Sequence, residues 1–337
     1  MNLLEIKNLK TSFFTSKGEV QAVRGVSFDL KKGEALGIVG ESGSGKSVTS
    51  MSIMKLLPEN GKIKEGEILF NDKDIVKMNM KEVRGVRGKD IAMIFQNPMS
   101  SLNPLIPIGK QVGEMIAIHN KLPKDEIKRR AIEMLGKVKI PEPEKRYGFY
   151  PHQFSGGMRQ RVMIAMALAN DPEILIADEP TTALDVTIQD QVLKEMAESI
   201  RERDMSMIFI THDLAVVAQI CTRVIVMYGG LIMESSPIEE LFKNPSHPYT
   251  MGLFKSLPSM DQSKDEKLHP IAGSPPDMLN PPKGCPFAPR CKYARVICRD
   301  ELPPMVEISK DHYSLCHLQT EEGLRQEGNP FREVRNA

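Results

Sequence analysis

The sequence predicts an α/β fold, in which a mostly parallel β-sheet is flanked by helices. Compact apolar runs of strand length recur at residues 35–39, 174–178, 207–211 and 223–228, and helical patterns such as 188–203 separate them. Short buried strands that alternate with helices are typical of parallel sheets covered on both faces. The chain of 337 residues has room for about two domains, and its 41% hydrophobic and 26% charged residues are typical of a soluble globular protein.

Charge balance and hydropathy exclude several classes of protein. Lysine and arginine total 45 against 44 aspartate and glutamate, a net charge of +1, so we expect no nucleic-acid partner. The longest strongly apolar stretch, Val162–Ala169, is far shorter than the roughly 20 residues needed to span a bilayer. The first residues carry Glu5 among apolar ones, unlike a secretion signal. We therefore expect a protein of the cytoplasm.

Two subdomains are expected to accompany the parallel sheet. Residues 3–30 alternate apolar and polar side chains in runs that Gly18 and Gly25 separate, which predicts an antiparallel β-subdomain of short strands. A helical pattern over Asp125 to Val138, in a region rich in charge and methionine, predicts a helical subdomain inserted at about residues 97–165.

The composition changes beyond about residue 236, where prolines accumulate. Because proline removes a backbone donor and fixes φ, regular elements are expected to be scarce there. We therefore predict a first domain over residues 1–235 and a proline-rich C-terminal extension over residues 236–337.

A glycine-rich segment between the predicted strand at 35–39 and a predicted helix fits a phosphate-binding pattern. Residues 40–47, GESGSGKS, match G-x-x-x-x-G-K-[ST]. Glycines let backbone N–H groups converge on a phosphate, the helix N-terminus adds partial positive charge, and Lys46 supplies a full one. Ser47 is the predicted Mg²⁺ ligand. The predicted nucleotide-binding residues of this loop and of the residue after it are Ser42, Gly43, Ser44, Gly45, Lys46, Ser47 and Val48.

Residues 174–179, ILIADE, supply the carboxylates that a nucleoside triphosphatase needs. The apolar residues bury the strand and place Asp178 at the carboxyl edge of the sheet, where it is expected to hold Mg²⁺ through water. Glu179 is the predicted general base, which polarises the water that attacks the γ-phosphate. The glycine-rich loop alone could belong to a kinase, a GTPase or a motor protein. Together the two motifs predict an enzyme that hydrolyses a nucleoside triphosphate with Mg²⁺ as its cofactor.

Residues 154–161, FSGGMRQR, resemble the signature sequence of ATP-binding cassette (ABC) proteins. Ser155, Gly156 and Gly157 precede an apolar helix, so they present another helix N-terminus to phosphate. The resemblance implies an ABC ATPase cassette over roughly residues 3–235. It also implies that this segment completes the nucleotide site of the opposite subunit, so that two ATP molecules lie between head-to-tail cassettes.

Further positions match the ABC pattern one by one. Gln96, in MIFQNP, corresponds to the Q-loop glutamine, and His212, in FITHD, corresponds to the switch histidine that contacts the γ-phosphate. Phe13 aligns with the aromatic residue that stacks on adenine, with Phe14 as the alternative. The resemblance thus assigns catalytic roles to Glu179, His212 and Gln96, nucleotide contacts to Phe13, Val23 and Asp178, Mg²⁺ contacts to Ser47, Gln96 and Asp178, and contacts to the opposite site to Ser155, Gly156, Gly157 and Asp185.

The segment 244–250, NPSHPYT, is similar to the HPY segment of oligopeptide and dipeptide importer ATPases, as are GESGSGKS and QNPMSSLNP in detail. This resemblance implies an ATP-binding subunit that is peripheral to the membrane at its cytoplasmic face and binds integral-membrane permease subunits. A peptide-binding protein would be an indirect partner. Either a second copy of the chain or a related ABC ATPase subunit would complete the dimer. The residues expected to expose apolar surface to the permease are Pro98, Met99, Leu102 and Pro104.

Other functions stay open at this point. The same ATPase could energise transport of nickel or another small solute, because the cassette does not touch the cargo. A soluble ABC protein that acts on DNA or ribosomes is disfavoured by the single cassette, the absence of sustained heptads and the balanced charge. A regulatory subunit without turnover is disfavoured because Glu179 and His212 are both present.

Four of the five cysteines lie close together in the proline-rich extension: Cys285, Cys291, Cys298 and Cys316. Four thiolates suit Zn²⁺ or an iron–sulfur cluster, unligated thiols are the third possibility, and a cytoplasmic setting disfavours disulfides. The absence of C-x2-C pairs weakens the zinc interpretation. The extension of the family with the pattern GCPFAPRC is associated with a [4Fe–4S] cluster, so the resemblance favours that cluster over Zn²⁺. Cys221 is expected to be a small buried apolar residue.

Overall fold

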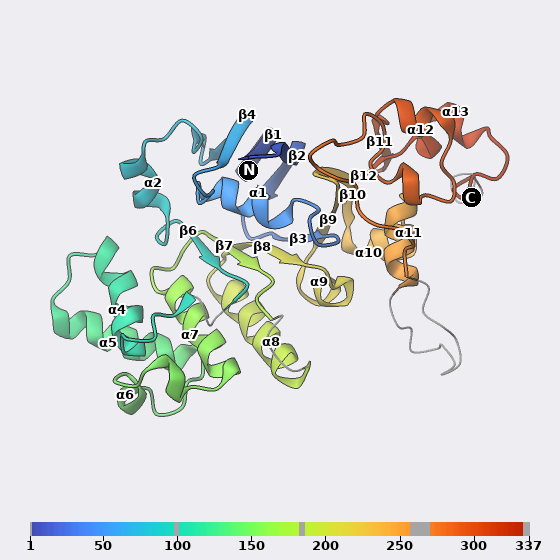
Figure 1. Cartoon of the computed structure of the whole chain (residues 1–337). Coiled ribbons are helices and arrows are strands. Elements are labelled where there is room, and N and C mark those ends of the chain that lie inside the picture. The colour runs from blue at the N-terminus through green and yellow to red at the C-terminus, as the bar shows by residue number, and fades with distance from the viewer. Residues whose placement is uncertain (1, 98–100, 182–185, 257–269, 333–337) are drawn as a thin grey trace. The chain divides into compact units, whose positions relative to one another are not determined.

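The structure is a computed structural model that describes residues 2–97, 101–181, 186–256 and 270–332 (Figure 1). The chain folds as two compact units, each discontinuous in sequence. The first unit comprises Met1–Leu4, Leu30–Ala35 and Phe70–Ile210, and the second comprises Glu5–Asp29, Leu36–Leu69 and Thr211–Ala337. The domain boundary expected near residue 235 thus falls inside the second unit and stays a prediction.

The first unit contains three parallel strands in the order β8-β7-β6. Their bounds are β6 Ile91–Ile94, β7 Ile174–Asp178 and β8 Ser206–Thr211. Ile174 pairs with Ile91 on one side and with Ser206 on the other, which fixes the register. Every residue of β7 and β8 is buried, as expected for central parallel strands without alternation. The strands predicted at 174–178 and 207–211 are therefore confirmed.

Helices make up most of the rest of the first unit. They are α2 (Met80–Val86), α4 (Ile108–His119), α5 (Lys124–Lys137), α6 (Pro143–Arg146), η1 (Pro151–Gln153), α7 (Gly156–Leu168) and α8 (Val186–Glu202), with the short strand β5 at Lys73–Asp74. Helices α4, α5 and α7 pack on one another, and Ala131 and Leu135 of α5 are fully buried. The helix predicted over residues 125–138 is confirmed to within one residue at each end.

The second unit begins with antiparallel strands longer than expected. They are β1 (Asn2–Thr15), β2 (Gly18–Lys31) and β4 (Gly61–Phe70), in the order β2-β1-β4. The prediction that Gly25 separates two short strands was wrong, because Gly25 lies inside β2 with φ +112°. A Cβ at Gly25 would lie 3.0 Å from Asn8 Oδ1, so this glycine allows close approach of two strands rather than ending one.

The nucleotide motif of the second unit lies beside a mixed set of strands. These elements are β3 (Ala35–Val39), α1 (Lys46–Ile53), α9 (Leu214–Ile220), β9 (Arg223–Tyr228) and β10 (Leu231–Pro237). Strand β3 pairs with β9 in parallel, and β10 pairs with β9 in antiparallel fashion through a turn at Gly229 and Gly230. Cys221 is 5% exposed, so its prediction as a buried apolar residue is confirmed.

The C-terminal extension contains short elements: α10 (Ile238–Lys243), α11 (Pro248–Lys255), η2 (Ala288–Arg290), α12 (Val296–Asp300), β11 (Met305–Ser309), β12 (His312–Leu315), η3 (His317–Gln319) and α13 (Glu321–Leu324). Strand β12 pairs with β10, with Ser314 opposite Glu234, and β11 pairs with β12. The expectation of scarce regular structure was wrong for these strands, because the alternating Val306 and Ile308 favour a strand. Among the described residues, no helix combines the length and apolar character needed to cross a lipid bilayer.

Candidate active site

The glycine-rich loop of residues 40–47, hereafter the P-loop, connects β3 directly to α1. Gly40, Gly43 and Gly45 all have positive φ, at +151°, +77° and +104°. A Cβ at Gly45 would lie 2.6 Å from the Ala22 carbonyl oxygen, and one at Gly40 would collide with the backbone of Met227. Only glycine therefore allows the chain to curl this tightly between strand and helix.

Lys46 begins α1 and folds back over the loop. Its side chain is 5% exposed, and Nζ donates to the carbonyl oxygens of Gly40 at 2.7 Å and Glu41 at 3.0 Å. Ser42 and Gly43 are exposed at the tip, and Ser47 and Val48 are half-buried in the first turn of the helix. Ser44 Oγ is buried without a hydrogen-bond partner among the described residues. The ammonium group is thus held inside the loop, and the residues at the tip of the loop, Ser42 and Gly43, are exposed to solvent.

In the first unit the end of β7 carries the two predicted carboxylates. Asp178 is the last residue of the strand and is 6% exposed. Glu179 adopts φ +46°, its N–H donates to the Ile210 carbonyl oxygen at 2.8 Å, and its Oε2 accepts from Gln96 Nε2 at 2.8 Å. Because β6 and β7 are parallel neighbours, their carboxyl ends bring together two predicted catalytic residues that lie far apart in sequence.

The signature segment forms the start of α7. Ser155 is the N-cap, and its Oγ accepts from the Met158 N–H at 3.3 Å. Phe154 is 3% exposed and packs edge-on against Phe149, which anchors the segment. Among the described residues, no heavy atom beyond the local chain would lie within 4 Å of a Cβ at Gly156. The prediction of a helix N-terminus at this segment is confirmed, and this terminus is open to solvent.

The remaining predicted residues occupy separate places. His212 is exposed just after β8, and the following Asp213 caps α9 by accepting from the Ala215 N–H at 2.8 Å. Val23 is buried, whereas the Phe14 ring is 40% exposed. Phe13 is half-buried, and its ring would lie 2.9 Å from a Cβ built at Gly61. Asp185, Pro98 and Met99 lie outside the described residues.

The structure brings some predicted residues together and assigns others to different units. Gln96 and Glu179 are in direct contact in the first unit, which also contains Asp178 and the signature segment. The P-loop, Phe13 and His212 belong to the second unit. Their roles in one nucleotide site therefore stay a prediction.

Comparison with known proteins gives the family. A family model for ABC transporters matches residues 23–182, and one for the C-terminal region of oligopeptide/dipeptide transporters matches residues 233–298. The oligopeptide transport ATP-binding protein OppD of Bacillus subtilis is 57% identical over 92% of this chain and 87% of its own length. The chain belongs to the ATP-binding subunits of oligopeptide and dipeptide ABC transporters. The resemblance inferred from the signature and HPY segments is confirmed.

Other relatives agree with this family. The dipeptide transport ATP-binding protein DppD of the same organism is 54% identical over 94% of this chain and 95% of its own length. Among solved structures, a dimeric post-hydrolysis ATP-binding cassette bound to ADP and Pi matches with a TM-score of 0.63 at 28% identity, covering 70% of this chain and 98% of that one. The predictions of an ABC cassette fold and of an ABC-type ATPase are confirmed.

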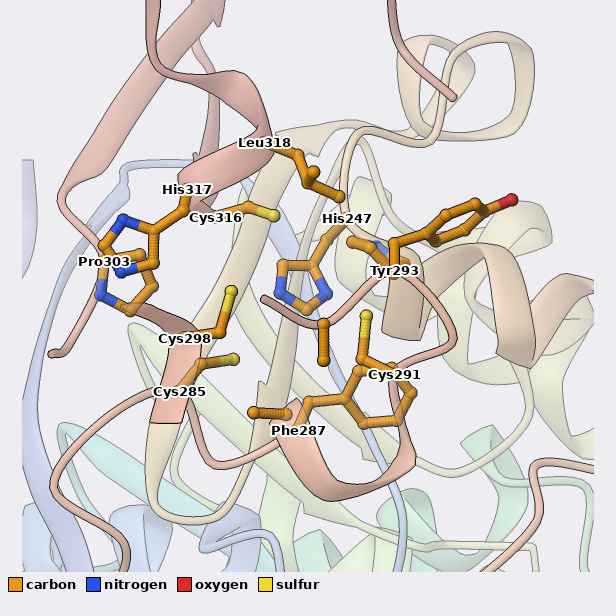
Figure 2. A pocket seen from close by; sticks show the side chains of 13 residues that line it. His247, Cys285, Phe287, Cys291, Tyr293, Cys298, Pro303, Cys316, His317 and Leu318 are labelled. Carbon is orange, nitrogen blue, oxygen red and sulfur yellow. The ribbon is translucent and has the colours of Figure 1, made fainter. Parts of the chain in front are cut away.

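The four clustered cysteines line one cavity of the second unit, together with His247 and Phe287 (Figure 2). All four are free thiols, and the Cys285 N–H donates to the Cys298 carbonyl oxygen at 2.8 Å. Burial raises the pKa of Cys285 to about 12 and also raises the pKa values of Cys291 and Cys316. Within the described ranges, no three ligating side chains are placed as a metal-binding group.

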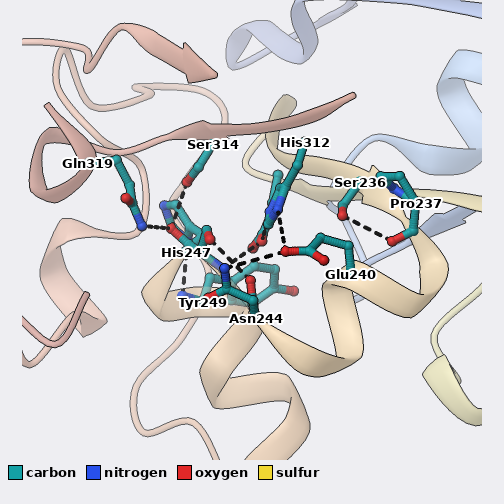
Figure 3. A network of polar contacts seen from close by, with 11 residues as sticks. Ser236, Pro237, Glu240, Asn244, His247, Tyr249, His312, Ser314 and Gln319 are labelled. Carbon is teal, nitrogen blue, oxygen red and sulfur yellow. Dashed lines mark hydrogen bonds and ion pairs between the residues drawn. The ribbon is translucent and has the colours of Figure 1, made fainter. Parts of the chain in front are cut away.

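A buried polar network attaches the extension to β10, and sequence reasoning missed it (Figure 3). Glu234 of β10 accepts from the Ser246 N–H at 2.6 Å and is bonded to His312 Nε2 at 2.8 Å. The Ser246 carbonyl oxygen accepts from Ser314 Oγ and Gln319 Nε2, both at 2.8 Å. Burial lowers the pKa of the neighbouring His247 to about 3 and so keeps its ring neutral. The HPY segment contains Ser246 and His247, but the sequence does not show their partners, which come from distant parts of the chain.

Proposed function

We propose that this ATP-binding subunit energises the uptake of peptides by hydrolysing ATP at a site that contains the P-loop, Asp178, Glu179 and Gln96. The observation that carries this proposal is the contact of 2.8 Å between Gln96 Nε2 and Glu179 Oε2 at the end of β7. A carboxylate held by a neighbouring amide can be oriented toward a water molecule, which is what a general base requires.

Each residue has a role that follows from its chemistry. Lys46 carries the positive charge that the terminal phosphates need, and the exposed rim of the P-loop can approach them closely. The buried Asp178 carboxylate and the Ser47 hydroxyl are hard oxygen ligands, which suit Mg²⁺. When bound, Mg²⁺ would neutralise phosphate charge. Glu179 would accept the proton of the attacking water, and His212 would hydrogen-bond the γ-phosphate.

A second cassette is proposed to complete the site. Ser155, Gly156 and Gly157 form a helix N-terminus open to solvent, which favours an anion supplied by another molecule. Asp185 would lie in the same interface. One cassette of known structure that matches this chain is dimeric and bound to ADP and Pi, which supports pairing of two cassettes. The partner would be a second copy of the chain or a related ABC ATPase subunit.

An integral-membrane permease is the other proposed partner, with this subunit at the cytoplasmic face of the membrane. Phe95, beside Gln96, is 44% exposed, and Leu105 is 83% exposed. Exposed apolar side chains near a nucleotide-sensing residue suit a helix of the permease. Leu102 does not contribute as expected, because it is 3% exposed and packs inside the first unit. A peptide-binding protein would act only through the permease.

Uptake measurements test the transported substrate. In a bacterial strain that lacks this chain, uptake of a labelled dipeptide and of a longer peptide is expected to fall to background, because the transporter then lacks a subunit that its ATP hydrolysis requires. Uptake of Ni²⁺ is expected to stay unchanged. Restoring the wild-type chain should restore peptide uptake, and restoring a Glu179→Gln variant should not. Loss of Ni²⁺ uptake with normal peptide uptake would contradict the peptide assignment in favour of nickel.

The cysteine-lined cavity is proposed to hold a [4Fe–4S] cluster, with Zn²⁺ as the alternative. Four free thiols around one cavity are the donor set of such a cluster. The cluster would have a structural role, tying together segments of an otherwise loop-rich extension.

Measurement of the metal content of the purified protein distinguishes an iron–sulfur cluster from Zn²⁺. Protein purified without oxygen is expected to be brown and to contain about four iron atoms per chain. A Cys298→Ser variant should lose the iron, while Cys221→Ser, which alters the buried cysteine beside Gly37, should keep it. Colourless protein with one zinc ion would contradict the iron assignment, and metal-free protein would contradict both.

A further inference from the structure

The guanidinium of Arg290, a residue of the C-terminal extension, is bonded to the side chain of Glu41, a residue of the P-loop. Its Nη1 donates to Glu41 Oε2 at 2.7 Å and to the Tyr228 hydroxyl at 3.0 Å. Nε and Nη2 donate to the carbonyl oxygens of Ala272 and Ile271, both at 2.9 Å. The Arg290 side chain is only 6% exposed. A planar guanidinium with these four contacts is fixed in one orientation.

The backbone of Glu41 is held by the same extension. Its N–H donates to the Tyr249 hydroxyl at 2.9 Å, and Tyr249 is fully buried in α11. The Tyr249 ring packs against Tyr228 at 4.6 Å and Phe287 at 5.2 Å between ring centroids. Thus one residue of the loop is fixed through both its main chain and its side chain, and both partners lie beyond residue 236.

The charge of Glu41 explains why such an anchor matters. Its carboxylate sits one residue after Gly40, whose carbonyl oxygen receives the Lys46 ammonium. An unpaired carboxylate here would repel the phosphates of a nucleotide and would compete for Lys46. The buried Arg290 cancels this charge at 2.7 Å, where solvent screens the pair weakly.

We propose that Arg290 and Tyr249 are positioning residues for nucleotide binding: Arg290 neutralises Glu41, and Tyr249 fixes the first turn of the P-loop. This inference rests on the proposed role of the P-loop in binding ATP. It makes the C-terminal extension part of the nucleotide site through its contacts with Glu41.

Equilibrium titration of the full chain with Mg·ATP and Mg·ADP tests the inference. Arg290→Ala is expected to weaken ATP binding about tenfold, as when a half-buried charge loses its partner. The loss should be smaller for ADP, which carries less negative charge. Tyr249→Phe is expected to weaken both about threefold. In the assembled transporter, Arg290→Ala should raise the KM for ATP more than it lowers kcat. Arg325→Ala is the matched control, because Arg325 forms an exposed ion pair with Glu321 and should change nothing.

The variant Glu41→Gln separates a charge effect from a folding defect. By itself it should bind ATP at least as tightly as the wild type, and combined with Arg290→Ala it should recover most of the lost affinity. Unchanged ATP binding by Arg290→Ala, an equal loss for ATP and ADP, or no recovery in the double variant would overturn the inference. A Lys46→Ala variant in the same titration tests the P-loop itself: if it binds ATP normally, the proposed nucleotide site fails. If Lys46→Ala no longer binds ATP while Arg290→Ala binds it normally, the inference about Arg290 fails and the proposed nucleotide site stands.

Discussion

Replacement of Glu179 by glutamine is expected to lower phosphate release by about 10²–10⁴-fold in the assembled transporter, while ATP binding is retained. Glutamine has nearly the same shape, and its amide oxygen can still accept from Gln96 Nε2 where the carboxylate does at 2.8 Å. It cannot take a proton from water at neutral pH. The variant should therefore accumulate an ATP-bound dimer, because the contacts that favour the closed state are lost only after hydrolysis.

The control for this variant lies at the opposite end of the same strand. Glu173 immediately precedes β7 and is exposed, and its Oε1 accepts from Asn71 Nδ2 at 3.4 Å. Glu173→Gln makes the same chemical change without touching the carboxyl edge of the sheet, and should leave turnover unchanged. Phosphate release and ATP occupancy are measured for both variants. Normal phosphate release by Glu179→Gln would remove this residue from the role of general base.

The central strands could be predicted from the sequence because burial on both faces leaves a local signature. The strands at 174–178, 207–211 and 223–228 read as continuous apolar runs, and the structure places them within one residue of these bounds. The helix N-terminus at Ser155 was equally visible, since serine followed by two glycines and an apolar run fits an N-cap. Local structures of this kind can be predicted because they depend on residues that are adjacent in the sequence.

Contacts between distant residues had no such signature. Glu179, which has a left-handed φ, donates its N–H to Ile210, a residue of another strand. Glu41 is anchored by Tyr249 and Arg290, more than 200 residues away. A single sequence gives the type of each residue but does not show which distant residues form hydrogen bonds or ion pairs with one another. For the same reason, the pairing of β12 with β10 could not be predicted from proline content. Proline content indicates only local backbone preferences.

Replacement of Lys46 by alanine is expected to weaken ATP binding by about 100-fold, which corresponds to about 3 kcal/mol. The ammonium group is the full positive charge that the P-loop itself supplies, and it is positioned by the carbonyl oxygens of Gly40 and Glu41 at 2.7 and 3.0 Å. Its removal leaves backbone N–H groups and the dipole of α1, which contribute only partial charges. Equilibrium titration with Mg·ATP gives the change in Kd.

A matched control and a folding measurement make the Lys46 result specific. Lys255, in the last turn of α11, is exposed, so Lys255→Ala removes the same charge from the same unit and should leave Kd unchanged. The Tm without nucleotide should be measured for both variants, because the buried Lys46 also satisfies two loop carbonyls. Nucleotide should then raise the Tm of Lys255→Ala and not that of Lys46→Ala, since a ligand stabilises only the state that binds it. Equal Kd values for the two variants would show that phosphate is held elsewhere than in the P-loop.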